Sequence, residues 1–115
     1  MSDVFDRLSC VLAKRRDASP ESSYVAQLHH KGLNKILEKV GEETTEMILA
    51  AKDAEHPAAD QRDALRSAVI KETADVWFHV MVALSHLGLT ISDVEAELAR
   101  RFDVSGLEEK ASRSC

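Results

Sequence analysis

The sequence is poor in several features that other classes of protein need. Two cysteines, four glycines, two prolines and 4% aromatic residues suit neither a disulfide framework nor a turn-rich β-protein. No apolar run approaches the roughly 18 residues of a membrane span, and the opening MSDVFDRLSC lacks the pattern of a signal peptide. We therefore expect a cytoplasmic, reduced and mainly helical protein, with Cys10 in its core.

An excess of positive charge is also missing. The net charge is -5, whereas general nucleic-acid-binding proteins usually carry a basic face. A phosphorylated substrate stays compatible with this charge if a metal ion lies between protein and phosphate. The 115 residues and 44% hydrophobic content predict one globular domain over residues 1–115.

Helical periodicity and turn residues divide the chain into five expected helices. They cover residues 3 to about 16, 24–30, 33 to about 53, about 60–86 and 91–102. Pro57 breaks the chain between the two long helices, Asp60 is expected to cap the second of them, and Thr90 with Asp93 is expected to cap the last. Gly88 is expected to stop the fourth helix. The pattern predicts an all-α antiparallel bundle with a polar tail of about 103–115, in which Ser105 to Arg113 are expected to order against the body or the substrate.

Three carboxylates crowd one stretch of the third helix, KVGEETTEM, residues 39–47. Glu42, Glu43 and Glu46 lie within little more than one turn, and like charges four residues apart destabilise a helix by a few tenths of a kcal/mol. Taken alone, the cluster fits a solvated acidic face.

A second acidic pair, Glu72 and Asp75, lies in IKETADVWFHVMVAL, residues 70–84. Apolar side chains surround nearly the whole of this helix, and such helices are normally buried. Two unpaired carboxylates there would be costly, so either a cation or a structural Lys or Arg partner is required. His79, on the same polar stripe, fits a packing or supporting role better than that of a ligand.

The two acidic groups lie at the same height if the helices form a hairpin centred near residue 59, inside the loop 55–60. Carboxylates without Cys or His suit hard cations, Mg²⁺ or Mn²⁺, bound together with substrate phosphates. A di-iron site would need Glu-x-x-His motifs, and no His follows a Glu at that spacing.

These residues resemble a known signature. Glu-Glu-x-x-Glu followed by Glu-x-x-Asp is similar to the motif of the all-α NTP pyrophosphatases, the MazG-like group. Four stretches resemble the phosphoribosyl-ATP pyrophosphatase family more narrowly: SYVAQL (23–28), KILEKVGEE (35–43), KETADVWFHVMVAL (71–84) and ARRFDVSGLEEKASR (99–113). Trp77-Phe78 departs from the smaller aliphatic residue and Tyr usual in the family, which should alter packing rather than chemistry.

The resemblance implies a helical bundle completed by a homodimer. It also implies Mg²⁺-dependent hydrolysis of phosphoribosyl-ATP to phosphoribosyl-AMP and pyrophosphate, the second step of histidine biosynthesis. Carried over residue by residue, it places metal ligands at Glu43, Glu46, Glu72 and Asp75. Glu42 is then a candidate for orienting the water, and Lys39 and Lys71 are candidates for contacting phosphates.

Two other functions stay open at this point. A house-cleaning pyrophosphatase acting on free dNTPs would use the same metal site. A non-enzymatic helical interaction module with an acidic groove would bind no Mg²⁺.

Overall fold

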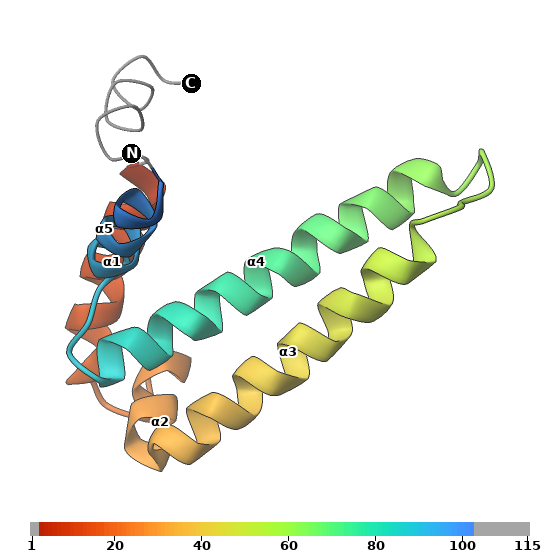
Figure 1. Cartoon of the computed structure of the whole chain (residues 1–115). Coiled ribbons are helices and arrows are strands. Elements are labelled where there is room, and N and C mark those ends of the chain that lie inside the picture. Colours follow the sequence, from red (N-terminus) through yellow and green to blue (C-terminus); the bar gives the residue numbers. More distant parts are fainter. Residues whose placement is uncertain (1–2, 103–115) are drawn as a thin grey trace.

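The computed structural model describes residues 3–102, and within that range it contains helices and no strand (Figure 1). The helices are α1 (Asp3–Arg16), α2 (Tyr24–Lys31), α3 (Leu33–Asp53), α4 (Arg62–His86) and α5 (Ile91–Arg101). The all-α prediction and the order of its five helices are therefore confirmed. The predicted docking of the tail 103–115 lies outside the described residues.

The longest helices, α3 and α4, form the antiparallel hairpin that the sequence predicts (Figure 1). Their connection contains Pro57, which cannot donate the backbone hydrogen bond that a continuous helix would need. Gly32 separates α2 from α3 with φ +100°, and Gly88 follows α4 with φ +78°. Both values lie in the left-handed region, which glycine adopts without strain, so the predicted stop at Gly88 is confirmed.

The helix caps agree with the sequence at one place and differ at another. The Thr90 backbone N–H donates to Asp93 Oδ2 at 2.9 Å, which confirms the capping box of α5. Asp60 does not cap α4. That helix begins at Arg62 after Gln61, without a side-chain cap, because the chain turns through 58–61 first, with the Gln61 N–H bound to the Ala58 carbonyl at 3.0 Å.

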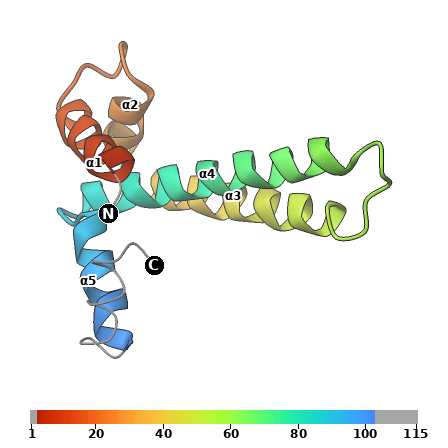
Figure 2. The ribbon, with the colours of Figure 1, turned by 90° about the horizontal axis from the view of Figure 1, so that it is seen from above.

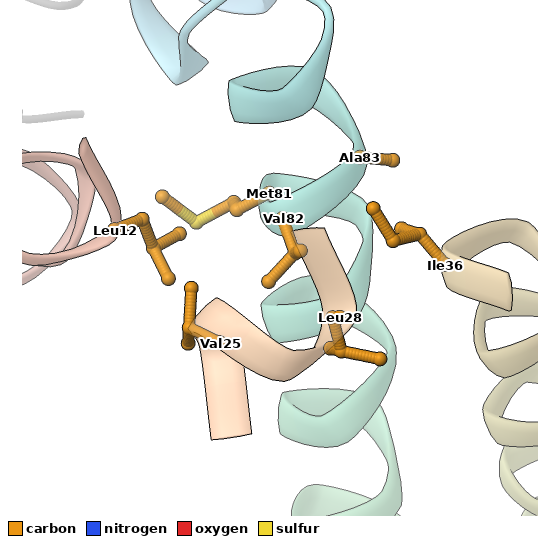
Figure 3. Packing of buried hydrophobic residues seen from close by; sticks show 7 residues of the cluster. All are labelled: Leu12, Val25, Leu28, Ile36, Met81, Val82 and Ala83. Carbon is orange, nitrogen blue, oxygen red and sulfur yellow. The ribbon is translucent and has the colours of Figure 1, made fainter. Parts of the chain in front are cut away.

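The core lies at the end of the hairpin away from its loop. There α1 and α2 pack on one side of α4, while α5 turns away on the other side (Figure 2). The buried cluster consists of Leu12, Val25, Leu28, Ile36, Met81, Val82 and Ala83 (Figure 3). Fully burying an aliphatic side chain contributes about 1.5–3 kcal/mol, so this cluster holds α2 and α3 against α4. Cys10 is exposed, contrary to prediction, because α1 turns Leu8 and Leu12 toward the core instead.

Helix α4 is far less covered than its apolar sequence predicts. Trp77 is 53% exposed and Ile70 71% exposed. Beside Trp77, side chains of α1, α4 and α5 line an apolar cavity of about 500 Å³ that includes Phe5, Val80 and Leu98. A single chain therefore leaves a face of its central helix without a neighbour among the described residues.

No single helix in the range 3–102 is both long and apolar enough to cross a membrane. Only α4 and α5 together, which meet at 104°, reach that length and hydropathy.

Candidate active site

Three of the predicted carboxylates meet between the two long helices. Glu43 and Glu46 project from α3 and Glu72 from α4, and each offers an oxygen within 4.8 Å of the others. The spacing of three residues on α3 places both side chains on the face turned to α4. The sequence predicted a hairpin whose turn is centred near residue 59, and this register brings the acids of the two helices together. Asp75, one turn beyond Glu72, is not part of this group.

Of the three carboxylates, Glu72 most clearly requires a bound cation. Its Oε1 is buried and has no hydrogen-bond partner, and the other oxygen lies 3.9 Å from the Nζ of the exposed Lys71. A buried acceptor without a partner costs about 1–3 kcal/mol, and more if it is charged. The alternative of a structural Lys or Arg partner leaves this oxygen unexplained, whereas a bound cation would satisfy it.

Glu43 shares this environment. It is only 8% exposed, and within residues 3–102 neither it nor Glu46 makes an ion pair with a basic side chain. Repulsion inside the α3 cluster is therefore compensated only at its edge. There Lys39 Nζ lies 3.4 Å from Glu42, while Glu38 turns to solvent and pairs with Lys35 at 3.1 Å. The acids nearest α4 are left for a ligand.

Lys39 interacts electrostatically with the carboxylates of α3. Burial lowers the pKa of its ammonium, but Tyr24, Glu42 and Glu43 together outweigh that effect and raise the pKa above its ordinary value. Lys39 is therefore charged at neutral pH, at the edge of a set of carboxylates. A positive charge there is well placed to meet a polyanionic ligand.

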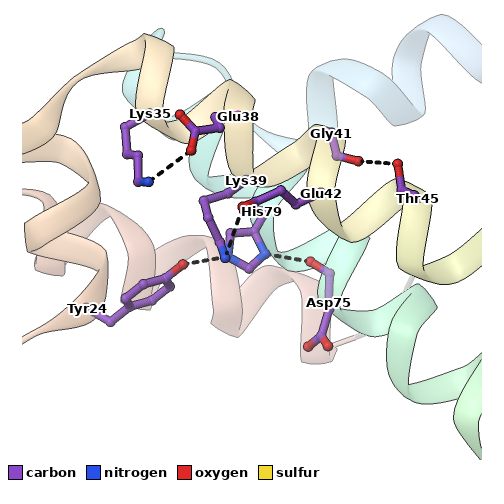
Figure 4. A network of polar contacts seen from close by, with 9 residues as sticks. All are labelled: Tyr24, Lys35, Glu38, Lys39, Gly41, Glu42, Thr45, Asp75 and His79. Atoms are coloured by element: carbon purple, nitrogen blue, oxygen red, sulfur yellow. Dashed lines mark hydrogen bonds and ion pairs between the residues drawn. The ribbon is translucent and has the colours of Figure 1, made fainter.

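A polar chain joins α2 to α4 beside Lys39 (Figure 4). Tyr24 Oη lies 2.9 Å from His79 Nε2, and His79 Nδ1 lies 2.8 Å from the Asp75 backbone oxygen. His79 is buried and packs edge-on against Tyr24 and Phe78. The histidine thus has the packing role that the sequence favoured, and Figure 4 shows the Asp75 carboxylate directed away from it.

A histidine pair lies nearer the core. His29 Nδ1 and His86 Nδ1 are 2.9 Å apart, with nearly parallel rings whose centres are 5.2 Å apart. With the Nδ1 atoms 2.9 Å apart, the ring centres can be 5.2 Å apart only if the two nitrogens point at one another. One proton therefore lies between them. Burial lowers the pKa of His29, and His86 and Arg16 act in the same direction against Asp17. The position of His29 after a short helical stretch predicts a surface residue, but its ring is partly buried against His86.

Comparison with known families shows which family the chain belongs to. Residues 5–102 match the family model described as phosphoribosyl-ATP pyrophosphohydrolase. The chain belongs to that family. Phosphoribosyl-ATP pyrophosphohydrolases are hydrolases of histidine biosynthesis that act on a small nucleotide substrate, so the resemblance and the enzyme class read from the sequence are confirmed.

The residues that match the phosphoribosyl-ATP pyrophosphohydrolase family include α1 from Phe5 onward and all of α2, α3, α4 and α5. The sequence predicted that Glu43 and Glu46 lie near Glu72, but it did not predict Tyr24 as a partner of His79. The signal was weak, because one tyrosine on an eight-residue helix gives no indication of which long helix it will face.

Proposed function

We propose that the chain hydrolyses phosphoribosyl-ATP with the help of Mg²⁺ or Mn²⁺ held at Glu43, Glu46 and Glu72. The observation that carries this proposal is the buried, unpartnered Glu72 Oε1 opposite two acids of α3, in a chain of this family. Carboxylate oxygens are the ligands that these hard cations prefer. Mg²⁺ usually takes one or two carboxylates and completes its shell with water and substrate phosphates, so three carboxylates are enough to hold such an ion.

When bound, such an ion supplies positive charge for the polyphosphate and a Lewis acid for the hydrolytic water. Asp75 remains a proposed fourth ligand because it follows Glu72 by one turn on α4. Among the described residues, the cluster itself contains only the other three.

The side chains around the acids have separate proposed tasks. Glu42 is exposed, and only one of its oxygens, Oε2, lies near Lys39, so its other oxygen is proposed to orient a water molecule at the rim of the site. Lys39 and the exposed Lys71 are placed to contact phosphate oxygens as charged donors. In the reaction, the water oxygen bonds to one phosphorus of the α–β anhydride, and the bridging oxygen leaves with the other. The water's protons pass to solvent or to the released phosphates.

A second copy of this chain is the proposed occupant of the apolar face beside Trp77. Its cavity is lined mainly by apolar side chains of three helices, and further apolar residues at the loop end of the hairpin, Ile48 and Ile70 among them, are exposed. Monomeric proteins rarely expose large contiguous apolar patches. A homodimer would bury this face and complete the bundle. In this proposal each subunit is a single domain. Its nucleotide substrate favours a cytoplasmic location.

The decisive experiment incubates the purified protein with phosphoribosyl-ATP and measures released pyrophosphate, with Mg²⁺, with Mn²⁺ and with a chelator. We expect release that requires the divalent ion, together with phosphoribosyl-AMP in equal amount. A parallel panel of dNTPs separates the house-cleaning alternative, since preference for a free dNTP would contradict the proposal. Calorimetric titration with Mn²⁺ separates the interaction module, which would bind none.

A further inference from the structure

Tyr24 is the first residue of α2, and a hydrogen bond to α4 fixes its hydroxyl end. Its Oη lies 2.9 Å from His79 Nε2, and Figure 4 shows the hydroxyl directed at the histidine. The Asp75 backbone oxygen only accepts, so His79 Nδ1, 2.8 Å from it, carries a hydrogen and Nε2 of the neutral imidazole accepts. Tyr24 therefore donates to a buried histidine, which favours one orientation of its ring.

The faces of the Tyr24 ring stay available although its hydroxyl is bound. The residue is 46% exposed. Its ring and that of His79 are nearly perpendicular, at 80°, with centres 5.8 Å apart. Because the hydroxyl end points at His79, the histidine lies beyond the oxygen and not over a ring face. The other aromatic contacts within residues 3–102 do not involve Tyr24.

The spacing along α4 places this ring beside the carboxylate group. His79 follows Glu72 by seven residues, which gives a rise of about 10 Å and a rotation of about 700°, close to two full turns. Both side chains therefore leave the same face of α4, and α2 also packs against α3. Tyr24 thus lies about two helical turns from Glu72, toward the core.

No other aromatic residue of the chain has this position. The sequence contains one tyrosine, one tryptophan and three phenylalanines. Trp77 follows Glu72 by five residues, so it is turned from it by about 140°, and it packs against Phe5 instead. Phe78 packs on the core, and Phe102 follows the end of α5.

We propose that the Tyr24 ring stacks on the adenine of a nucleotide whose polyphosphate lies at Glu43, Glu46 and Glu72. An α-phosphate and a ribose separate the base of such a nucleotide from its β-phosphate, a span of about two helical turns. Aromatic side chains bind bases by stacking because every base has a π-face, and a ring already held by its hydroxyl loses little freedom on binding. This inference rests on the proposed function, because it starts from a polyphosphate at the three acids.

The kinetic test compares two substitutions at Tyr24 in the full chain. Tyr24→Leu removes the ring, so KM for phosphoribosyl-ATP should rise at least about fivefold, with kcat within about threefold. Tyr24→Phe keeps the ring and loses only the hydrogen bond, so both constants should stay within about threefold of wild type. Phe102→Leu is the matched control at an exposed aromatic residue outside the site, and it should change neither constant.

Two kinetic results would overturn the proposal. One is an unchanged KM in Tyr24→Leu. The other is a Tyr24→Phe variant as impaired as Tyr24→Leu, because the hydroxyl and not the ring would then matter.

Product inhibition separates stacking from a general disturbance of the site. Phosphoribosyl-AMP contains the adenine, whereas pyrophosphate does not. Tyr24→Leu should therefore raise the inhibition constant of phosphoribosyl-AMP at least about fivefold and leave that of pyrophosphate within about twofold. An equal rise of both constants would show that the substitution acts on the carboxylates, and it would contradict stacking.

NMR detects the stacking directly, even if Tyr24→Leu does not fold. The chain has a single tyrosine, so the signals missing from the Tyr24→Phe spectrum identify its ring protons. In the wild-type protein with Mg²⁺ and saturating phosphoribosyl-AMP, we expect nuclear Overhauser effects from these protons to H2 or H8 of the adenine. Upfield shifts of the adenine protons should accompany them. Absence of both signals would refute the proposal.

Failure of the proposed function gives a different result. A wild-type protein that releases no pyrophosphate with any divalent ion would refute the hydrolysis. The NMR measurement still decides the stacking, because it needs no turnover, and contacts between the adenine and the tyrosine would support Tyr24 as a base-binding residue. An active enzyme without these contacts would overturn the stacking alone.

Discussion

The two ends of the α3–α4 hairpin are formed by the same helices with the same apolar periodicity, but their apolar side chains are buried at one end and exposed at the other. At the end near α1 and α2, Ile36 and Val82 are completely buried. Toward the loop, Ile48 and Ile70 are mostly exposed, because within the described residues only two helices are present there. Periodicity therefore fixes which face of a helix is apolar, and the neighbouring elements decide whether that face is buried. The carboxylate group lies between these two ends.

The largest contrast should appear in stability. Ile36→Ala opens a cavity in the core and should lower the free energy of unfolding by about 2–5 kcal/mol. Ile70→Ala, at the opposite end, should cost about 0.5 kcal/mol or less in a lone chain. Urea unfolding at low protein concentration measures both. A cost of Ile70→Ala close to that of Ile36→Ala would show that another chain covers the loop end.

Removing a charge between the two ends should affect activity and spare the fold. Glu72→Gln should reduce pyrophosphate release at least about 100-fold, because it weakens both metal binding and neutralisation of the transition state. Stability should hold or rise, since the charge is removed from a carboxylate whose buried Oε1 has no hydrogen-bond partner. Asp75→Asn tests whether the fourth acid belongs to the site and is expected to cause a similar loss.

Glu38→Gln is the control for both changes, since Glu38 faces solvent and pairs with Lys35; it should keep wild-type activity. Unfolding of Glu72→Gln or Asp75→Asn would instead make these acids structural ion-pair partners and contradict the metal site.

The apolar face beside Trp77 offers a test of what covers α4. Trp77→Glu places a charge in the proposed interface and should weaken self-association at least about tenfold. Analytical ultracentrifugation measures this effect. Ser92→Glu, at an exposed position of α5 outside the cavity, should associate like wild type. A wild-type protein that stays a folded monomer at micromolar concentration would refute the dimer.

The smallest effect concerns the proton shared by His29 and His86. Because the pKa of His29 is lowered in the fold, the unfolded chain binds protons more readily, and stability should fall as the pH drops below the ordinary histidine value of about 6.5. His29→Gln should make this decline shallower in thermal melts between about pH 7 and 5. His30→Gln, at an exposed neighbour, should leave the slope unchanged.

The sequence predicts what depends on local spacing. Helix order, the Thr90 cap and the alignment of Glu43 with Glu72 follow from periodicity and from one short loop. Partners that depend on how separate helices pack were not predictable. Cys10, the pair of His29 with His86, and the Tyr24 contact all require knowing which face of α1 or α2 meets α4. Asp75 shows the same limit inside the site, since spacing along α4 gives its height but not the direction of its carboxylate.

The register of the hairpin has a consequence for insertions and deletions. One residue added to α4 between Glu72 and the core residue Met81 would turn Glu72 by about 100° and move it by about 1.5 Å relative to the core, away from Glu43 and Glu46. The same residue added within 55–60 would lengthen an exposed connection and leave both helices in place, at little cost in closure entropy. Variation in chain length should therefore be tolerated at the hairpin's tip and not in the helical turns between Glu72 and the core.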